Sequence, residues 1–224
     1  MKKAIAILLS LTMILGLAAC GNSANQTEKP STEDTSVESK ADTECAENGT
    51  DMENTDNQDV QNHKALVAYF SATGTTKGVA EHIANGLNAD IYEIVPEEPY
   101  TDADLDYNDN NSRTTIEMND PNARPVISGS VENMEQYDTV FIGYPIWWGE
   151  APRIVSTFME SYDFSGKTIV PFCTSGGSGI GSSASNLESF TSGATWLDGR
   201  RLNGSDSQDT VMEWVNSLDL NLAE

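Results

Sequence analysis

The residues with the most specific chemistry lie between residues 71 and 76, in a segment we call the hydroxyl turn. It follows an apolar run and precedes a segment with helical spacing of its apolar residues. A helix start presents unpaired backbone N–H groups and the positive end of the helix dipole, which together bind anions. The alternative is a plain N-cap, which needs only one hydroxyl. With four hydroxyls and a glycine that permits close approach, the turn predicts a phosphate site at Ser71, Thr73, Gly74, Thr75 and Thr76.

The segment from Gly143 to Pro152, the tryptophan loop, places two adjacent tryptophans after another apolar run. Exposing both indoles to water is costly, and adjacent side chains do not point into the same core. One indole could stack on a planar aromatic ligand. The alternatives are a tryptophan that covers the end of a sheet and a contact between subunits. The pattern predicts a ring-binding loop that includes Pro145, Ile146, Trp147 and Trp148.

A third segment, residues 174–181, holds four glycines and is called the glycine loop. Its backbone can approach a flat ring closely because glycine carries no side chain. Such a loop supplies N–H and C=O partners to the polar edge of a ring system. By itself the pattern is common, and it gains weight only beside the other two segments. The predicted contacts are Thr174, Ser175, Gly176 and Gly177.

Other site types fit the sequence poorly. The hydroxyl turn lacks the Gly-Lys-Ser/Thr ending of a nucleoside triphosphate loop, and no Gly-x-Gly-x-x-Gly follows the first apolar run. The alternating residues Asp102, Asp104 and Asp106 do not form a calcium loop, because Tyr107 and Arg113 stand where glycine and glutamate are required.

The elements that must position these segments alternate along the chain. Apolar runs predict strands at 65–70, 91–95, 139–144, 168–173 and 195–197. Helical patterns lie around 79–87, 152–162, 184–190 and 211–218. This alternation predicts a doubly wound α/β fold, a parallel sheet with helices on both faces. Ligands of such sheets bind at the carboxyl ends of the strands, where all three segments would lie.

Four local signals add detail. Pro152 can open a helix, and Ser205 with Gln208 matches a capping box. Pro171 is uncommon in a central strand because it donates no ladder hydrogen bond. The polar excursion, Pro99 to Pro125, contains one short helix around residues 113–118, and its length indicates that it covers part of a site.

With these residues in view, the chain resembles the flavodoxin family from about residue 64 to 218. The segment from Tyr69 to Thr76 resembles the family's phosphate loop, and the tryptophan and glycine loops resemble its ring-binding loops. The resemblance implies a flavodoxin-like five-stranded sheet of order 2-1-3-4-5 and FMN as cofactor. The phosphate would then bind the hydroxyl turn, and the isoalloxazine would lie against residues 145–148 and the glycine loop. The polar excursion departs from the family pattern, although its Tyr107 is a candidate stacking partner.

This resemblance implies an FMN electron-transfer protein. The Pro145–Gly149 sequence is most similar to a bacterial lipoprotein branch of the flavodoxins, which is also similar to the NAD(P)H:quinone oxidoreductases. With the long polar excursion, this loop makes an FMN-dependent NAD(P)H:quinone oxidoreductase the alternative. A third hypothesis is a lipoprotein that binds another phosphorylated ligand without catalysis. The partners would be a redox protein, or NAD(P)H and a quinone.

The N-terminus indicates export. Residues 1–19 combine two lysines with an apolar run, as in a secretory signal, and Leu17-Ala18-Ala19-Cys20 resembles a bacterial lipobox. We therefore expect lipidation at Cys20, a polar tether over residues 20–62 and a folded domain over 63–224, outside the cytoplasm and anchored to a membrane. A disulfide between Cys45 and Cys173 is not favoured, since nothing holds the tether near the strand.

The net charge of −23 limits which classes of partner the protein can bind. Nucleic acid is excluded, because phosphate backbones require clustered lysine and arginine. An acidic surface suits a basic redox partner reached by electrostatic steering, and it also suits solubility alone.

Overall fold

The computed structural model describes residues 64–220. The predicted signal, lipidation site and tether, with Cys45, lie outside the described residues. None of the described helices is long and apolar enough to cross a membrane.

The central sheet is parallel, with strand order β2-β1-β5-β6-β7 and with β8 also paired to β6. Its strands are β1 (Ala65–Tyr69), β2 (Asp90–Glu93), β5 (Thr139–Pro145), β6 (Thr168–Thr174), β7 (Thr195–Trp196) and β8 (Arg200–Leu202). The short strands β3 (Val95–Pro96) and β4 (Ile127–Ser128) form a separate antiparallel pair. With that pair set aside, the central strands follow the predicted flavodoxin-like order.

The sheet edge beyond β6 departs from the prediction of one strand at 195–197, because two short strands pair there instead. Leu197 N donates to Ile169 O at 2.9 Å, so the peptide groups of alternate β6 residues, including Pro171, face this edge. Pro171 has no N–H to donate. A Cβ at Gly199 would lie 2.7 Å from Pro171 Cγ, so the ring occupies the gap between β7 and β8. Pro171, uncommon in a central strand, therefore lies where the edge pairing is interrupted.

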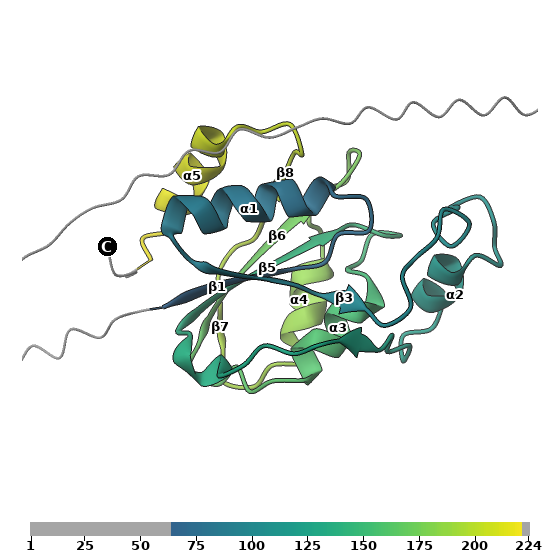
Figure 1. Ribbon diagram of the computed structural model, residues 1–224, viewed down its shortest axis with the longest axis horizontal. Coiled ribbons are helices and arrows are strands. Elements are labelled where there is room, and N and C mark those ends of the chain that lie inside the picture. Colours follow the sequence, from purple (N-terminus) through teal and green to yellow (C-terminus); the bar gives the residue numbers. More distant parts are fainter. Residues whose placement is uncertain (1–63, 221–224) are drawn as a thin grey trace, which may run out of the picture. The chain divides into compact units, whose positions relative to one another are not determined.

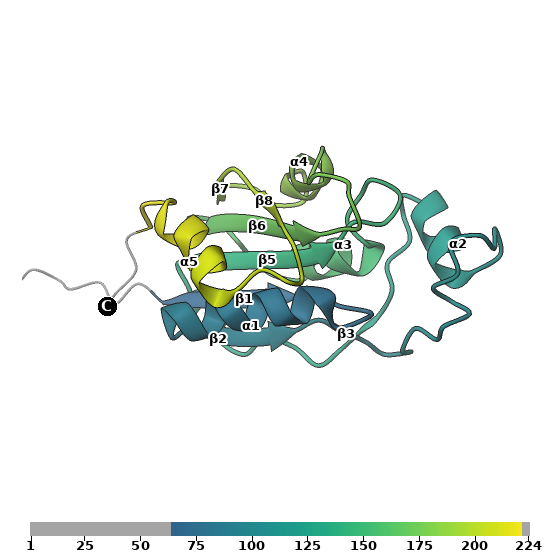
Figure 2. The same ribbon diagram turned by 90° about the horizontal axis from the view of Figure 1, so that it is seen from above.

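Helices cover both faces of the sheet (Figures 1 and 2). One face carries α1 (Thr75–Leu87) and α5 (Gln208–Asn216), and the other carries α3 (Arg153–Glu160) and α4 (Ser183–Glu188). The helix α2 (Arg113–Asn119) confirms the expected short helix, and it stands beyond the carboxyl ends of the strands in Figure 2. A 3-10 turn, η1, spans Met134–Gln136.

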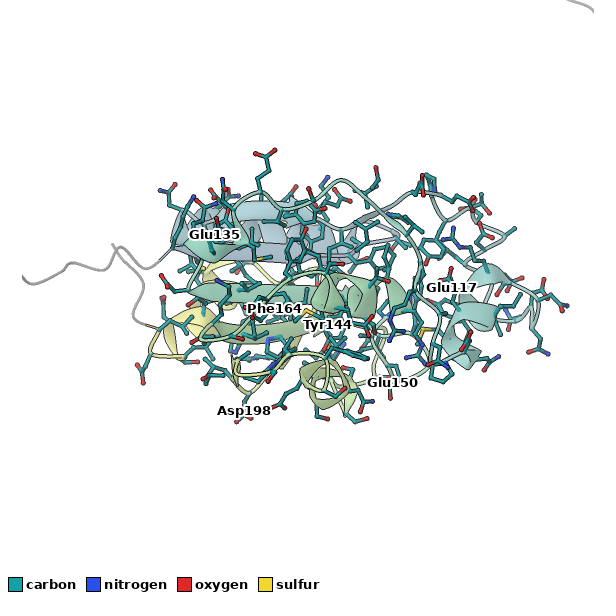
Figure 3. The ribbon with its side chains drawn as sticks, turned by 90° about the horizontal axis from the view of Figure 1, so that it is seen from below. Glu117, Glu135, Tyr144, Glu150, Phe164 and Asp198 are labelled. Atoms are coloured by element: carbon teal, nitrogen blue, oxygen red, sulfur yellow. The ribbon has the colours of Figure 1, made fainter. Side chains whose placement is uncertain are left out.

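Each face buries its own apolar cluster. Val79, Ile83 and Trp214 pack against one face, and Phe158 packs among aromatic rings on the other. Figure 3 views the second face and shows Tyr144 and Phe164 within it. The strand β1 is buried along its whole length, as a strand covered on both sides must be. The helix predicted around residues 184–190 ends at Glu188, and Phe190 beyond it is exposed.

The capping box predicted at Ser205 is wrong. The N-cap of α5 is Ser207, whose Oγ accepts a hydrogen bond from Thr210 N at 3.3 Å. The helix begins two residues later than the Ser205–Gln208 spacing requires, because Asp206 turns back to accept from Asn203 N at 2.8 Å.

Ser207→Ala should therefore lower the free energy of unfolding by about 1 kcal/mol, the usual cost of losing an N-cap. Ser205→Ala is the matched control and should change it by less than about 0.5 kcal/mol. Urea unfolding curves measure both. An equal loss in the two variants would contradict this assignment.

Candidate functional site

The three predicted loops meet at one edge of the sheet, at the carboxyl ends of β1, β5 and β6. Backbone bonds join them, from Phe70 N to Gly143 O and from Ile146 N to Thr174 O, each 2.9 Å. The hydroxyls of Thr76 and Thr174 lie 2.8 Å apart. Parallel strands made this convergence predictable.

The hydroxyl turn leaves the start of α1 open. Gly74 is the N-cap, with φ of +85°, a left-handed conformation that glycine adopts without strain. No side chain within the described residues caps this end, and its first turn carries no acidic residue. The first N–H groups of α1 are thus available to an anion.

The predicted phosphate contacts differ in exposure. Thr73 and Thr75 are exposed, with Oγ1 atoms 3.5 Å apart, and Ser71 is half-buried. Thr76 and Thr174 are buried and bonded to each other, so their hydroxyls join two loops rather than face solvent. Lys77, the cation directly after the turn, has its Nζ 3.5 Å from Glu93 Oε2. An anion would therefore be held mainly by N–H groups and by the hydroxyls of Thr73, Thr75 and Ser71.

The two adjacent tryptophans have opposite environments. Trp147 is only 2% exposed and packs edge to face on Phe70, with ring centroids 5.5 Å apart. Trp148 is 44% exposed. The cause is a tight turn, in which Trp147 and Glu150 exchange backbone bonds of 2.9 Å while Trp148 and Gly149 take φ of +48° and +83°. Trp147 therefore covers the sheet end, the alternative noted above, and only Trp148 presents its indole to a ligand.

The polar excursion folds onto the tryptophan loop. Tyr100 packs edge to face on Trp147, with centroids 5.4 Å apart, and Arg113 lies 4.2 Å above the Tyr100 ring. The Tyr100 hydroxyl donates to Glu117 at 2.6 Å, and burial together with this carboxylate raises the pKa of Tyr100 above its ordinary value. Sequence reasoning missed Tyr100; an aromatic residue next to Pro99, at the start of the polar excursion, was the available signal.

Tyr107 lies at the outer rim of the site. Its ring centroid is 4.9 Å from that of Trp148, and 58% of its surface is exposed. The aromatic pair joins the excursion to the tryptophan loop beside solvent. The excursion therefore packs over the tryptophan loop, and its role at a ligand site stays a prediction.

The glycine loop offers backbone rather than side chains. Ser175 Oγ donates to Ser178 O and accepts from Gly177 N at 3.3 Å, which shapes the loop. A Cβ added at Gly176, Gly177 or Gly179 would meet nothing within 4 Å, so open space lies above the loop. A flat ligand could occupy that space.

A cavity of about 380 Å³ lies beside the tryptophan loop, between α3 and α4. It shares only Glu150 and Ala151 with the predicted loops, and Glu150 there accepts from Asn186 at 2.7 Å. Within residues 64–220 no cluster of histidine, cysteine or acidic residues could hold a metal ion.

Cys173 is the last residue but one of β6, next to the glycine loop, and is fully buried. Burial raises the pKa of its thiol to about 12. Since the thiolate is the nucleophile, iodoacetamide at pH 8.5 should leave Cys173 unmodified in the native protein and should alkylate it after unfolding. Raising the pH should speed the reaction only as it approaches 12 or unfolds the chain. Peptide mass spectrometry measures this, and native labelling at the rate of a free thiol would contradict it.

Comparisons with known proteins agree with this arrangement. The sequence model of the family described as Flavodoxin matches residues 64–218. A candidate flavoprotein of Bacteroides eggerthii is 49% identical, with a TM-score of 0.67, over 71% of this chain and 100% of that one. Another from Bacteroides uniformis is 47% identical, with a TM-score of 0.66, over 69% and 98%. A Lactobacillus acidophilus flavoprotein solved in complex with FMN is 21% identical, with a TM-score of 0.50, over 68% and 99%. Among curated proteins none matches this chain.

Proposed function

This chain belongs to the flavodoxin family, and from that premise we propose that its domain binds one FMN and transfers electrons. The observation that carries the proposal is the meeting of three loops at the uncapped start of α1. The FMN complex of the Lactobacillus protein, which has the same fold, supports this choice of ligand.

The residues present fit FMN chemically. Thr73, Thr75 and Ser71 would hold the phosphate with the first N–H groups of α1. Trp148 and Tyr107 offer aromatic surface to the ring, and the open glycine loop offers backbone partners to its polar edge. When bound, FMN supplies the redox chemistry, while the protein sets affinity and potential.

Absorption spectra test the proposal directly. The purified protein should show flavin bands, and apoprotein should regain them with one equivalent of FMN. A protein that remains colourless with added FMN, or that prefers another phosphorylated ligand, would overturn the proposal.

An electron carrier fits the site better than an enzyme. The residues predicted to contact the ring are proline, isoleucine, tryptophan, hydroxyl residues and glycine, and electron transfer through a flavin needs no acid–base group from the protein. The NAD(P)H:quinone activity is tested by mixing the FMN-loaded protein with NADPH and a soluble quinone. Rapid multiple turnover without another protein would favour the enzyme over the carrier.

We also propose that a lipid on Cys20 holds the domain outside the cytoplasm, on the strength of the lipobox pattern. Several buried acyl chains make such an anchor stable. Cells fed a labelled fatty acid should label the protein, and Cys20→Ser should abolish the label and release the protein from membranes. Unchanged membrane association of the unlabelled variant would contradict this anchor.

The net charge of −23 supports a basic protein as redox partner. Electrostatic steering makes association with such a partner fall steeply with ionic strength. Electron transfer to a basic acceptor protein should therefore slow markedly between low and physiological salt. Transfer to an acidic acceptor of similar potential should not show this fall, and equal salt dependence for both would contradict the proposal.

A further inference from the structure

Arg201 lies against the proposed flavin site but was not singled out by the sequence. It stands on β8 directly opposite Cys173 of β6. Its Nη2 donates to Ser175 O at 3.3 Å and to Asn203 Oδ1 at 2.8 Å. The guanidinium thus bonds to the backbone of the glycine loop, the segment that would line the polar edge of the ring.

The charge of Arg201 has no carboxylate partner within residues 64–220. The ion pairs there belong to Lys64, Lys77, Arg113 and Arg124. Arg201 Nε is buried and makes no hydrogen bond. A partly buried cation without a counter-ion costs free energy, and in a chain of net charge −23 carboxylates are plentiful. The missing counter-charge indicates a role toward an anionic ligand.

The segment after Arg201 reaches the hydroxyl turn. Asn203, its hydrogen-bond partner, is held by Asp206, and a Cβ added at Gly204 would lie 2.6 Å from Thr75 Cγ2. Arg201 is therefore linked on one side to the glycine loop and on the other to the turn proposed for the phosphate. A charge at this place acts on whatever binds between them.

We propose that Arg201 is a positioning residue that holds the Ser175 carbonyl in place and favours the reduced form of the bound flavin with its positive charge. The inference rests on the proposed binding of FMN. Reduced flavin carries additional negative charge, and a cation nearby stabilises that form by the same electrostatics that shift a pKa. The negative charge of the surface disfavours reduced flavin and so lowers its midpoint potential. Arg201 would make that potential higher than the net charge alone implies.

Three substitutions of Arg201 and one matched control test the inference. Arg201→Gln and Arg201→Met remove the charge, and Arg201→Lys keeps it. Arg200→Gln is the control. It also removes one positive charge, but from an exposed residue next to Arg201 on the same strand. The measurement is the midpoint potential of the FMN-loaded protein, together with the dissociation constant of oxidised FMN.

Arg201→Gln should weaken binding of reduced FMN at least tenfold relative to oxidised FMN. A tenfold change in the ratio of the two dissociation constants corresponds to a fall of about 30 mV in the two-electron midpoint potential. Arg200→Gln should change the ratio less than twofold, and Arg201→Lys should recover most of the loss. Arg201→Met gives the same test if the glutamine variant does not fold.

Each outcome separates the two proposals. If Arg201→Gln and Arg201→Met bind FMN and have the same midpoint potential as Arg200→Gln, Arg201 has no role in the potential. The proposal that the domain binds FMN would still stand. If lysine fails to recover the loss, the charge is not the cause. If the wild-type protein binds neither form of FMN, the proposed function fails and this inference fails with it.

Discussion

Thr73→Ala combined with Thr75→Ala should weaken FMN binding by at least about a hundredfold. Each hydroxyl that donates to a charged group contributes about 1.5–3 kcal/mol, and about 1.4 kcal/mol corresponds to a factor of ten. Both side chains are exposed on the hydroxyl turn, so their removal should leave folding intact. Quenching of FMN fluorescence on titration with apoprotein measures the dissociation constant.

Riboflavin is the control for this prediction because it has the ring but no phosphate. The double variant should bind riboflavin as the wild type does, within about twofold. Thr195→Ala, an exposed threonine on β7, should leave FMN binding unchanged. Equal losses for FMN and riboflavin would show that the turn does not hold the phosphate.

Trp147→Ala should lower the free energy of unfolding by about 3–5 kcal/mol, the usual cost of removing a buried aromatic side chain. Its indole is 2% exposed and lies between Phe70 and Tyr100. The change therefore opens a cavity and also removes the contact that holds the polar excursion. Chemical unfolding of the apoprotein measures this loss without a contribution from ligand.

Trp148→Ala is the matched variant one residue away. It should change stability by less than about 0.5 kcal/mol and weaken FMN binding roughly tenfold, because stacking contributes about 1.5 kcal/mol. Trp147→Phe should recover much of the stability lost by alanine. If Trp147→Ala folds as stably as Trp148→Ala, the division of roles between the two indoles is wrong.

Much of the fold could be predicted from the sequence because it depends on the local periodicity of apolar residues. The buried strand β1 is a continuous apolar run, and α3 begins at Arg153 with Pro152 as its N-cap, one residue later than predicted. Strands and helices that alternate along the chain leave few arrangements of a parallel sheet. The place of the three loops at one edge followed from that order.

Other features depended on contacts that residue type and periodicity do not specify. Ser205 and Ser207 are equally suited to cap a helix by type, and Asp206 decided between them through its bond to Asn203. The split edge strand needed the ring of Pro171 packed against Gly199, residues that no local pattern connects.

By itself, the sequence determined the α/β architecture, the carboxyl-edge position of the three loops and the hydroxyl-rich composition of the turn proposed for the phosphate, since these follow from periodicity and residue type. Only the tertiary structure decided which tryptophan is buried, that Tyr100 supports it and that Arg201 reaches the glycine loop. The physical reason is that a side chain's environment is set by packing between remote segments. Trp147 and Trp148 are chemically identical, and a turn with Tyr100 against one side makes one of them core and the other surface.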